Sequence, residues 1–395
     1  MPPSALRERL ASLGRAGGPA ARPRRLAVER IVPPGFEAVE TAYGTAWRFA
    51  DVLARGRLPG PEPEIAHAYL DTETTGLSGG TGTQVFVVAI CRPCPAGLEL
   101  TQVFLADPAG EAAFLTLVQE EIARSARLAS YNGARFDLPL LRTRWVMARM
   151  PGELEHPRHL DLLDLTRSLL RARLERCTLR VVEERLLGFE REGDLASALV
   201  PEAYLAYVRH GWSPMLPMAL EHNRQDVISL YHLHARLLLR LSGRDPWMEG
   251  GSDWLALGRH LFRTGRRADG WRALRNAAEL ADGPDSARAA LLLARRLTRR
   301  RRPAAAERLL SEVNSRLARE PRLAIARARL MEWSLGDLAG AREVVAAALE
   351  GLAPDSPYRT DLEWRLQRLE SKLLRRLAER AAGASAGKSP TLSRP

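Results

Sequence analysis

A short apolar run, Ala68–Leu70, ends directly in two carboxylates that are one residue apart, Asp71 and Glu73. Residues i and i+2 of a β-strand point to the same face, so a strand here sets both carboxylates side by side at its end. Two like charges this close raise each other's pKa unless a cation neutralises them. The pair therefore indicates a site for Mg²⁺ or Mn²⁺, and two solvated acids beside a Gly-rich turn are the alternative.

Strand and helix patterns alternate through the region that contains this pair. Interleaved strands and helices indicate an α/β fold, with a mostly buried, mixed five-stranded sheet flanked by helices. Residues 38–50 add a further strand or a hairpin before it. The five expected strands are Ala66–Leu70, Val85–Ile90, Leu98–Leu105, Leu128–Tyr131 and His159–Leu162, and the main helices are Glu111–Ala126, Phe136–Met150 and Met215–Leu239.

The pattern changes near residue 250, after which only helix-length blocks of Ala, Leu and Arg remain. Residues 257–268 align with residues 293–304, and the same phase returns at residues 331–339. A period of about 35 residues with paired helices resembles tetratricopeptide-like repeats, and an irregular helical domain is the alternative. We expect a basic, flexible leader (1–35), the α/β domain (36–245), all-α helical repeats (250–380) and a disordered tail (381–395).

The chain of 395 residues carries a formal net charge of +12, mostly through Arg. Such a field favours polyanions, of which nucleic acid (DNA or RNA) is the commonest, although a GC-rich genome also enriches Arg and Ala. No apolar run reaches the ~18 residues that span a membrane, and residues 1–30 lack the apolar core of a secretory signal. We therefore expect a cytoplasmic protein with no membrane partner.

Three cysteines, Cys91, Cys94 and Cys177, are an odd number and argue against a disulfide framework. Cys91 and Cys94 have the spacing of a zinc knuckle or a redox pair, but no second Cys or His pair lies nearby. They follow a strand and precede Pro95-Ala96-Gly97, which predicts a hairpin turn.

Two later segments carry further acidic candidates. Asp137 falls in the first turn of a helix that follows the strand at Leu128–Tyr131, where an Asp also serves simply to complement the helix dipole. His222 and Asp226 are four positions apart, so both project from one face of a helix. A His one turn before an Asp suits a base beside a metal-bound carboxylate, whereas a lone His is more often structural.

These segments together resemble a known family. Asp71-x-Glu73-Thr74-Thr75-Gly76-Leu77, Asn132-Gly133-x-x-Phe136-Asp137-x-Pro139 and His222-x-x-x-Asp226 occur in the order and approximate spacing of the three exonuclease motifs of the DEDD superfamily, which has a ribonuclease H-like fold. More narrowly, residues 77–83, 138–144, 159–163, 187–192 and 221–226 are similar to the YprB-like ribonuclease H-like domain family. The resemblance covers about residues 35–240.

The resemblance implies a hydrolase, most simply a 3′-5′ exonuclease that cleaves phosphodiester bonds of single-stranded DNA or RNA with two divalent metal ions, Mg²⁺ or Mn²⁺. It implies that four carboxylates are catalytic metal ligands and that His222 orients or deprotonates the attacking water. These ligands are Asp71, Glu73, Asp137 and Asp226. The residues implied to contact the terminal nucleotide, partly through main-chain amides, are Thr74, Thr75, Gly76, Leu77, Asn132 and Phe136.

One position departs from the two main subgroups, which have a His five residues before the last Asp or a Tyr four before it. Here Glu221 is five before and His222 is four before. Residues on a helix are about 100° apart, so His222 shares the face of Asp226 and Glu221 does not. We expect Asp161 and Asp164 to cap a helix or to support the ligands from behind.

Other classes of function lack their motifs. Residues 79–83 have neither the Gly-Lys-Ser/Thr ending of a P-loop nor the spacing of a dinucleotide fold, and no Gly-x-Ser-x-Gly elbow indicates a serine hydrolase. The alternative to a nuclease is a non-catalytic scaffold that binds nucleic acid and recruits a protein partner through its helical repeats.

Overall fold

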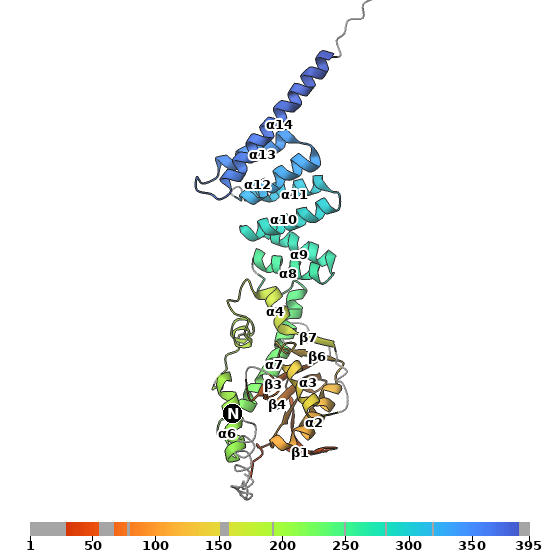
Figure 1. The fold of residues 1–395 in the computed structure, drawn as a ribbon, viewed down its shortest axis with the longest axis vertical. Helices are drawn as coiled ribbons and strands as arrows, with labels where there is room; N and C mark the ends of the chain where they lie inside the picture. The colour runs from red at the N-terminus through yellow and green to blue at the C-terminus, as the bar shows by residue number, and fades with distance from the viewer. Residues whose placement is uncertain are drawn as a thin grey trace, which may run out of the picture.

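A seven-stranded mixed sheet is the centre of the N-terminal half of the molecule (Figure 1). The structure is a computed structural model and describes residues 29–54, 67–76, 80–150, 158–191, 193–248, 250–280, 283–317 and 320–386. The strand order is β1-β2-β5-β4-β3-β6-β7. The strands are β1 (Glu37–Thr41), β2 (Gly44–Leu53), β3 (His67–Thr74), β4 (Val85–Cys94), β5 (Gly97–Phe104), β6 (Arg127–Ser130) and β7 (Arg158–Asp161).

Strand β3 lies near the middle of the sheet, antiparallel to β4 and parallel to β6. The five expected strands are all present, and the α/β fold is confirmed. The sheet has seven strands rather than five because the hairpin of β1 and β2 continues it beyond β5, with Trp47 to Leu53 paired antiparallel to that strand. Strands β4 and β5 form the expected hairpin, in which Cys94 pairs with Gly97 and the cysteines carry free thiols.

Alternate residues of β3 face two different helical layers. Ala68 and Leu70 face α2, with α3 beside it, whereas Tyr69 and Asp71 face α7, beside which α4 and α6 pack. The Tyr69 hydroxyl lies 2.8 Å from Nδ1 of His234 on α7, and this contact holds α7 against the face of the sheet. These helices are α2 (Glu111–Ala123), α3 (Asp137–Met147), α4 (Leu162–Leu170), α6 (Val200–His210) and α7 (Leu216–Leu241).

Short helical segments connect these layers. They are η1 (Pro108–Gly110), α5 (Leu179–Val182), η2 (Glu183–Leu187) and η3 (Ser197–Leu199). The segment from α5 to η3 lies beside α7 and contributes side chains to the site described below.

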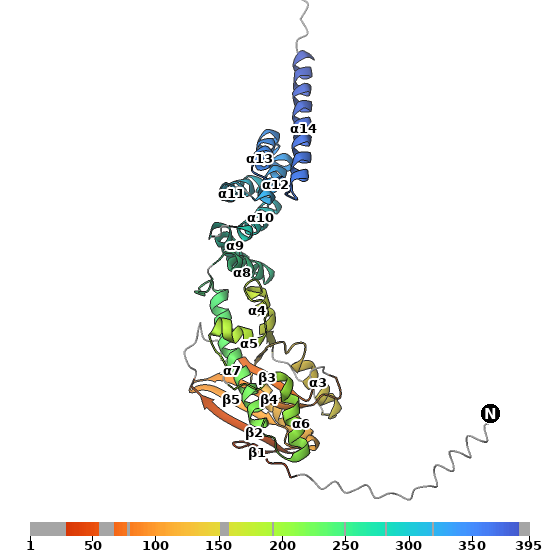
Figure 2. The same cartoon turned by 90° about the vertical axis from the view of Figure 1, so that its left-hand side faces the viewer.

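A stack of helices follows α7 and extends away from the sheet (Figure 2). Consecutive helices pack in pairs, and α8, α10 and α12 begin at Gly251, Pro284 and Pro321, close to the expected repeat. Gly258 on α8 brings the two helices of the first pair together, since a Cβ there would lie 2.7 Å from Leu274. The elements are α8 (Gly251–Arg263), α9 (Arg267–Leu280), α10 (Pro284–Arg299), α11 (Pro303–Arg316), α12 (Pro321–Leu330), η4 (Met331–Leu335), α13 (Leu338–Glu350) and α14 (Arg359–Ala386).

The ends of the chain differ in part from expectation. Residues 1–28 of the expected leader and residues 387–395 of the expected tail lie outside the described residues. Helix α14 continues to Ala386, so the tail cannot begin at residue 381. Among the described helices, none is long and apolar enough to cross a membrane.

Candidate active site

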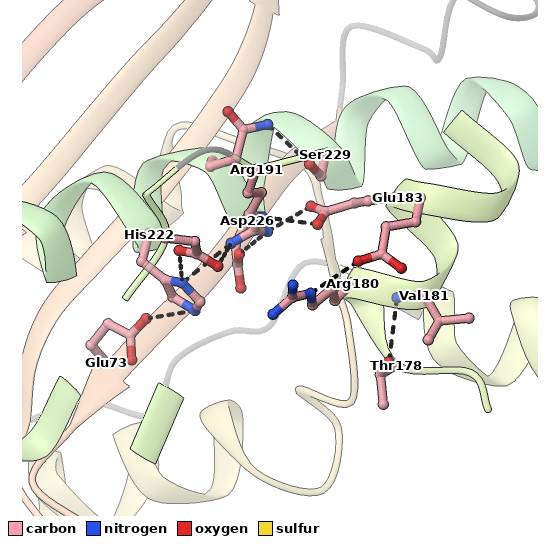
Figure 3. Close-up of polar contacts among 12 residues, drawn as sticks. Glu73, Thr178, Arg180, Val181, Glu183, Arg191, His222, Asp226 and Ser229 are labelled. Atoms are coloured by element: carbon pink, nitrogen blue, oxygen red, sulfur yellow. Dashed lines mark hydrogen bonds and ion pairs between the residues drawn. The ribbon is translucent and has the colours of Figure 1, made fainter. Parts of the chain in front are cut away.

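Asp71 and Glu73 share the face of β3 that α7 covers. Nδ2 of Asn223 on α7 donates a hydrogen bond of 2.8 Å to Oδ2 of Asp71. Nε2 of His222 lies 3.9 Å from Oε1 of Glu73 (Figure 3). The ladder between β3 and β4 shifts register just after Glu73, so the strand carries the two carboxylates to the point where regular pairing is interrupted.

Asp137 reaches the same end of β3 from the first turn of α3. Its Oδ1 accepts a hydrogen bond of 2.5 Å from the Thr72 hydroxyl, which lies between the other two carboxylates in the sequence. The turn before α3 needs Gly133, because a Cβ there would lie 2.1 Å from Oγ of Ser130. Asn132 has a φ of 68°, a conformation that Asn tolerates better than most residues.

Asp161 supports this turn from behind, as expected. Its carboxylate accepts hydrogen bonds from the backbone amides of Asn132 (2.9 Å) and Ala134 (3.3 Å). It also caps α4 by accepting from the amide of Leu163. Asp164 is exposed and pairs with Arg135 at 3.1 Å, so it lies apart from the carboxylate cluster.

His222 and Asp226 both face the site from α7, one turn apart. The side chain of His222 is 11% exposed, whereas that of Glu221 is 65% exposed and pairs with Arg224. The helical phase expected from the sequence is therefore observed. Nδ1 of His222 lies 2.7 Å from Oδ1 of Asp194, which leaves Nε2 directed toward Glu73.

Arg191 is the cation of the site in this structure. Its Nη2 lies 2.5 Å from Oδ1 of Asp226 and 2.6 Å from Oε1 of Glu183 (Figure 3). Its Nη1 lies 3.6 Å from Oδ2 of Asp194. The Arg191 side chain is only 9% exposed. A charge this buried must be paired, and the carboxylates around it satisfy that requirement.

Burial raises the pKa of all four motif carboxylates. For Asp71 the next causes are repulsion by Asp226, Asp137 and Glu73, which outweigh the hydrogen bond from Asn223. Burial and then repulsion by Asp226 and Asp137 raise the pKa of Glu73 against the opposing charge of Arg191. Burial raises the pKa of Asp137 to about 6 against the opposing hydrogen bond from Thr72, and it raises that of Asp226 despite the charge of Arg191. The charge of Arg191 therefore does not offset the burial of these carboxylates and the repulsion between them.

The donor chemistry fits a hard divalent cation, because carboxylate oxygens are the ligands that Mg²⁺ and Mn²⁺ prefer. The present spacing is wider than a coordination shell. Within the described residues, no group of three or more His, Cys, Asp and Glu side chains is arranged to hold a metal ion. The four carboxylates are close enough to repel one another, so a cation that drew them together would relieve that repulsion.

A pocket of about 250 Å³ opens beside the cluster. His222, Asp226 and Arg191 line one part of it, and Arg180 and Ser197 line another. Arg180 is exposed and pairs with Glu184 at 3.0 Å. The pocket gives a polar ligand access to the two α7 side chains.

The residues expected to contact a nucleotide are partly engaged within the chain. The amide of Thr75 donates to the carbonyl of Gln84 (2.9 Å), and the hydroxyl of Thr74 donates to the carbonyl of Gly76 (2.8 Å). The Thr75 amide therefore already has a partner within the chain, whereas the resemblance implied that main-chain amides of this segment contact the nucleotide. Phe136 precedes α3 and is half-buried. Leu77 lies outside the described residues.

Sequence reasoning did not assign roles to Arg191, Asp194, Glu183 or Asn223. Asn223 follows His222 directly and faces Asp71, because it lies about 100° further round α7. Its position in the helix could therefore have been used to predict that it reaches the site. Glu183 is the first residue of the short η2, and Arg191 and Asp194 lie in the irregular segment between η2 and η3, where no periodicity indicates the direction of a side chain.

The comparisons with known proteins agree with this fold. A sequence model described as RNase_H superfamily matches residues 68–238. YprB of Bacillus subtilis strain 168, whose function is uncharacterised, is 33% identical over 171 residues, which are 43% of this chain and 41% of YprB. The chain thus spans less than half of that relative's length.

Two solved structures are also similar. NrnC of Brucella melitensis bound to pGG has 20% identity and a TM-score of 0.31, covering 56% of this chain and 89% of NrnC. The family B DNA polymerase of Pyrobaculum calidifontis has 16% identity and a TM-score of 0.36, covering 82% of this chain and 50% of the polymerase. The family match and the mixed sheet with its flanking helices show a ribonuclease H-like fold.

Proposed function

We propose that this protein is a metal-dependent nuclease, most specifically a 3′-5′ exonuclease acting on single-stranded DNA or RNA. The observation that carries the proposal is the approach of Asp71, Glu73, Asp137 and Asp226 to one end of β3 from three separate elements. Burial, and after it repulsion by neighbouring carboxylates, raises the pKa of Asp71 and Glu73. A chain gains nothing in stability from such an arrangement, which is characteristic of sites that bind a ligand or a metal.

Asp71, Glu73, Asp137 and Asp226 would hold two divalent ions, Mg²⁺ or Mn²⁺. Such ions, when bound, activate water and stabilise the leaving oxygen of a phosphodiester. The carboxylates supply the negative charge that holds cations against a polyanionic substrate. Thr72 fixes the orientation of Asp137, and Asn223 fixes that of Asp71.

His222 is the proposed general base. With Nδ1 held by Asp194 at 2.7 Å, its Nε2 is free to accept a proton from a water beside Glu73. Asp194 also stabilises the imidazolium that forms, so it is a positioning residue. The apolar ring of Phe136 and the side chain of Asn132 would contact the terminal nucleotide, together with the segment Thr74–Leu77.

The test uses the full chain with 3′-labelled and 5′-labelled single strands of DNA and of RNA, with Mg²⁺ and with Mn²⁺. We expect mononucleotides to be released from the 3′ end, and this release to be lost in Asp71→Ala and Asp226→Asn. Asp164→Asn is the matched control, because it removes a carboxylate that lies outside the cluster.

A second candidate, a non-catalytic nucleic-acid-binding scaffold with a protein partner, is favoured by one observation. Arg191 already pairs with Asp226, as a structural ion pair would. Tight strand binding without release of nucleotides with either metal would establish this candidate and exclude the nuclease. On the sequence argument alone, we propose the cytoplasm as the location of either activity.

A further inference from the structure

The net charge of the chain is confined to its C-terminal part. Residues 1–250 contain 30 Lys and Arg and 30 Asp and Glu, so they are formally neutral. Residues 251–395 contain 29 Lys and Arg against 17 Asp and Glu, which accounts for the whole charge of +12. Apart from the basic leader of residues 1–35, the part of the chain that attracts polyanions is therefore the helical region and not the domain with the carboxylate cluster.

The helical region contains a groove of about 560 Å³ between α10, α11 and α12. Its floor is apolar, with Leu291 and Leu310 among the lining side chains. Three exposed arginines form its rim, Arg295 and Arg299 from α10 and Arg329 from α12. We call these side chains, together with Trp333, the Arg/Trp groove.

In the described part of the chain, the side chains of the rim arginines have no acidic partner and no hydrogen bond. Arginines nearby on the same helices do have partners: Arg288 lies 2.8 Å from Asp285, and Arg327 lies 2.7 Å from Glu307. Three guanidinium groups converge on one groove without a counter-charge. Such a set is suited to an anionic ligand that approaches from solvent.

Trp333 closes one end of the groove and is 67% exposed. Nζ of Lys372 lies 4.4 Å from the centre of its ring and Cζ of Arg368 lies 5.8 Å away, both from α14. These two cations also pair with the buried Glu332 beside it, so the backbone that carries Trp333 is fixed. An exposed, oriented indole ring is a surface on which a nucleobase stacks.

We propose that the Arg/Trp groove binds single-stranded nucleic acid, with phosphates on Arg295, Arg299 and Arg329 and a base stacked on Trp333. Arg295 and Arg299 are one helical turn apart and therefore project to the same side of α10, as a row of phosphates requires. The groove is a second site for the strand, remote along the chain from the carboxylate cluster. It rests on the proposed function only in that the same strand would be the substrate.

An acidic peptide is the other ligand that an apolar floor with a basic rim accepts. Two observations favour a nucleic acid instead. The basic surface continues past Arg299 into Arg300, Arg301 and Arg302 at the end of α10, all exposed, which suits a long polyanion. In addition, the family match assigns the adjoining domain to a superfamily named for a nucleic-acid-cleaving enzyme.

The test measures fluorescence anisotropy of a labelled single-stranded oligonucleotide with the full chain in EDTA, which prevents hydrolysis. For the triple variant Arg295→Gln/Arg299→Gln/Arg329→Gln, we expect at least a tenfold higher Kd. We also expect its salt dependence, d log K/d log [salt], to be smaller by about 2, since each phosphate contact contributes about 0.7. Trp333→Ala should weaken binding about 5-fold to 100-fold, and Trp333→Phe should retain most of the affinity.

The matched control is Arg272→Gln/Arg275→Gln/Arg288→Gln, which removes the same charge from exposed arginines that already have acidic partners. Equal losses in both triple variants, or wild-type binding by the groove variant, would overturn the proposal. A groove variant that binds the oligonucleotide normally but loses polyglutamate would assign the groove to acidic peptides. The assay measures binding without hydrolysis. If the protein binds the strand through the groove but degrades no substrate, the result contradicts the proposed nuclease activity and leaves the proposed groove site intact.

Discussion

Arg191 neutralises a carboxylate that the proposed metal site needs. It lies 2.5 Å from Asp226, yet burial and repulsion still raise the pKa of Asp71 and Glu73, so one guanidinium group does not offset the negative charge of the cluster. A divalent ion and the guanidinium group would therefore compete for Asp226. Binding of metal would have to release this ion pair or reduce its strength.

Removal of this competitor should strengthen metal binding. We expect Arg191→Met, combined with Glu183→Gln so that the Glu183 carboxylate is not left buried and unpaired, to lower the Kd for Mn²⁺ about tenfold, or ~1.4 kcal/mol. Isothermal titration calorimetry on the full chain measures this without reference to activity. Arg180→Met, in the same pocket but exposed, is the control. Weaker Mn²⁺ binding by the double variant would show that Arg191 helps to organise the site.

The raised pKa of Asp137 should also make metal-free stability depend on pH. The folded protein keeps a proton on Asp137 up to a pH of about 6, whereas the unfolded chain loses it near its ordinary pKa of 3.8. The folded state thus binds more protons in this window, and the free energy of unfolding falls as the pH rises from about 4 to above 6.

We expect this group to account for a loss of about 1–3 kcal/mol across that window in EDTA. Asp137→Asn can still accept the hydrogen bond from Thr72 and should show a smaller loss. Urea unfolding at a series of pH values measures the difference, with Asp164→Asn as the exposed control. Identical pH profiles for Asp137→Asn and the wild type would contradict the assignment.

At the scale of single elements, the rotation of α7 decides which side chains reach the site. His222 and Asn223 face the two carboxylates of β3, and Glu221 faces solvent. The helix is held in this phase by contacts across the sheet, including the one between Tyr69 and His234. A shift of one residue would exchange the histidine for a carboxylate that the cluster could not accommodate.

This phase gives a direct comparison of neighbouring residues. We expect His222→Ala to lower the rate of metal-dependent hydrolysis about 10²–10⁴-fold, as loss of a general base does. Glu221→Ala should leave the rate within about twofold, because its side chain is exposed and pairs only with Arg224. Single-turnover cleavage of a labelled strand measures both. The reverse order of effects would mean that Glu221 takes the role of the base.

The same elements show how much the sequence could predict. Period-2 and period-3.6 patterns located the strands and helices that bear Asp71, Glu73, Asp137, His222 and Asp226, because those residues lie in regular elements whose faces follow from spacing. The β1–β2 hairpin was expected only as an addition, since pairing with β5 joins segments more than 40 residues apart. Arg191 and Asp194 lie in irregular backbone, where direction depends on tertiary contacts.

At the scale of the whole molecule, a buried ionic network connects α7 to the helices that follow. Arg240, near the end of α7, pairs with Asp245 at 2.9 Å and with Asp253 on α8. All three side chains are 0–1% exposed. Arg236 also pairs with Asp245 at 2.9 Å. Helix α7, which carries His222 and Asp226, leads into the helical stack (Figure 1). Buried ion pairs therefore join this helix to α8.

Breaking this network should destabilise the connection between α7 and α8 more than it destabilises the α/β domain or the helical stack. Removal of one partner of a buried ion pair typically costs about 3–5 kcal/mol, because the remaining charge is left without compensation. We expect Arg240→Met to lower the free energy of unfolding by this amount and to expose the α7–α8 connection to limited proteolysis. Arg244→Met, at an exposed position in the same connection, should change neither.

The same variant separates the two proposed strand sites. If the carboxylate cluster and the Arg/Trp groove hold one strand at once, a loosened junction lowers the effective concentration of one site relative to the other. With Mg²⁺ present and strands made of uncleavable phosphodiester analogues, Arg240→Met should then weaken binding of long oligonucleotides while leaving unchanged the affinity for oligonucleotides too short to reach both sites. Equal weakening for both lengths would indicate that the network stabilises the folded chain without coupling the sites.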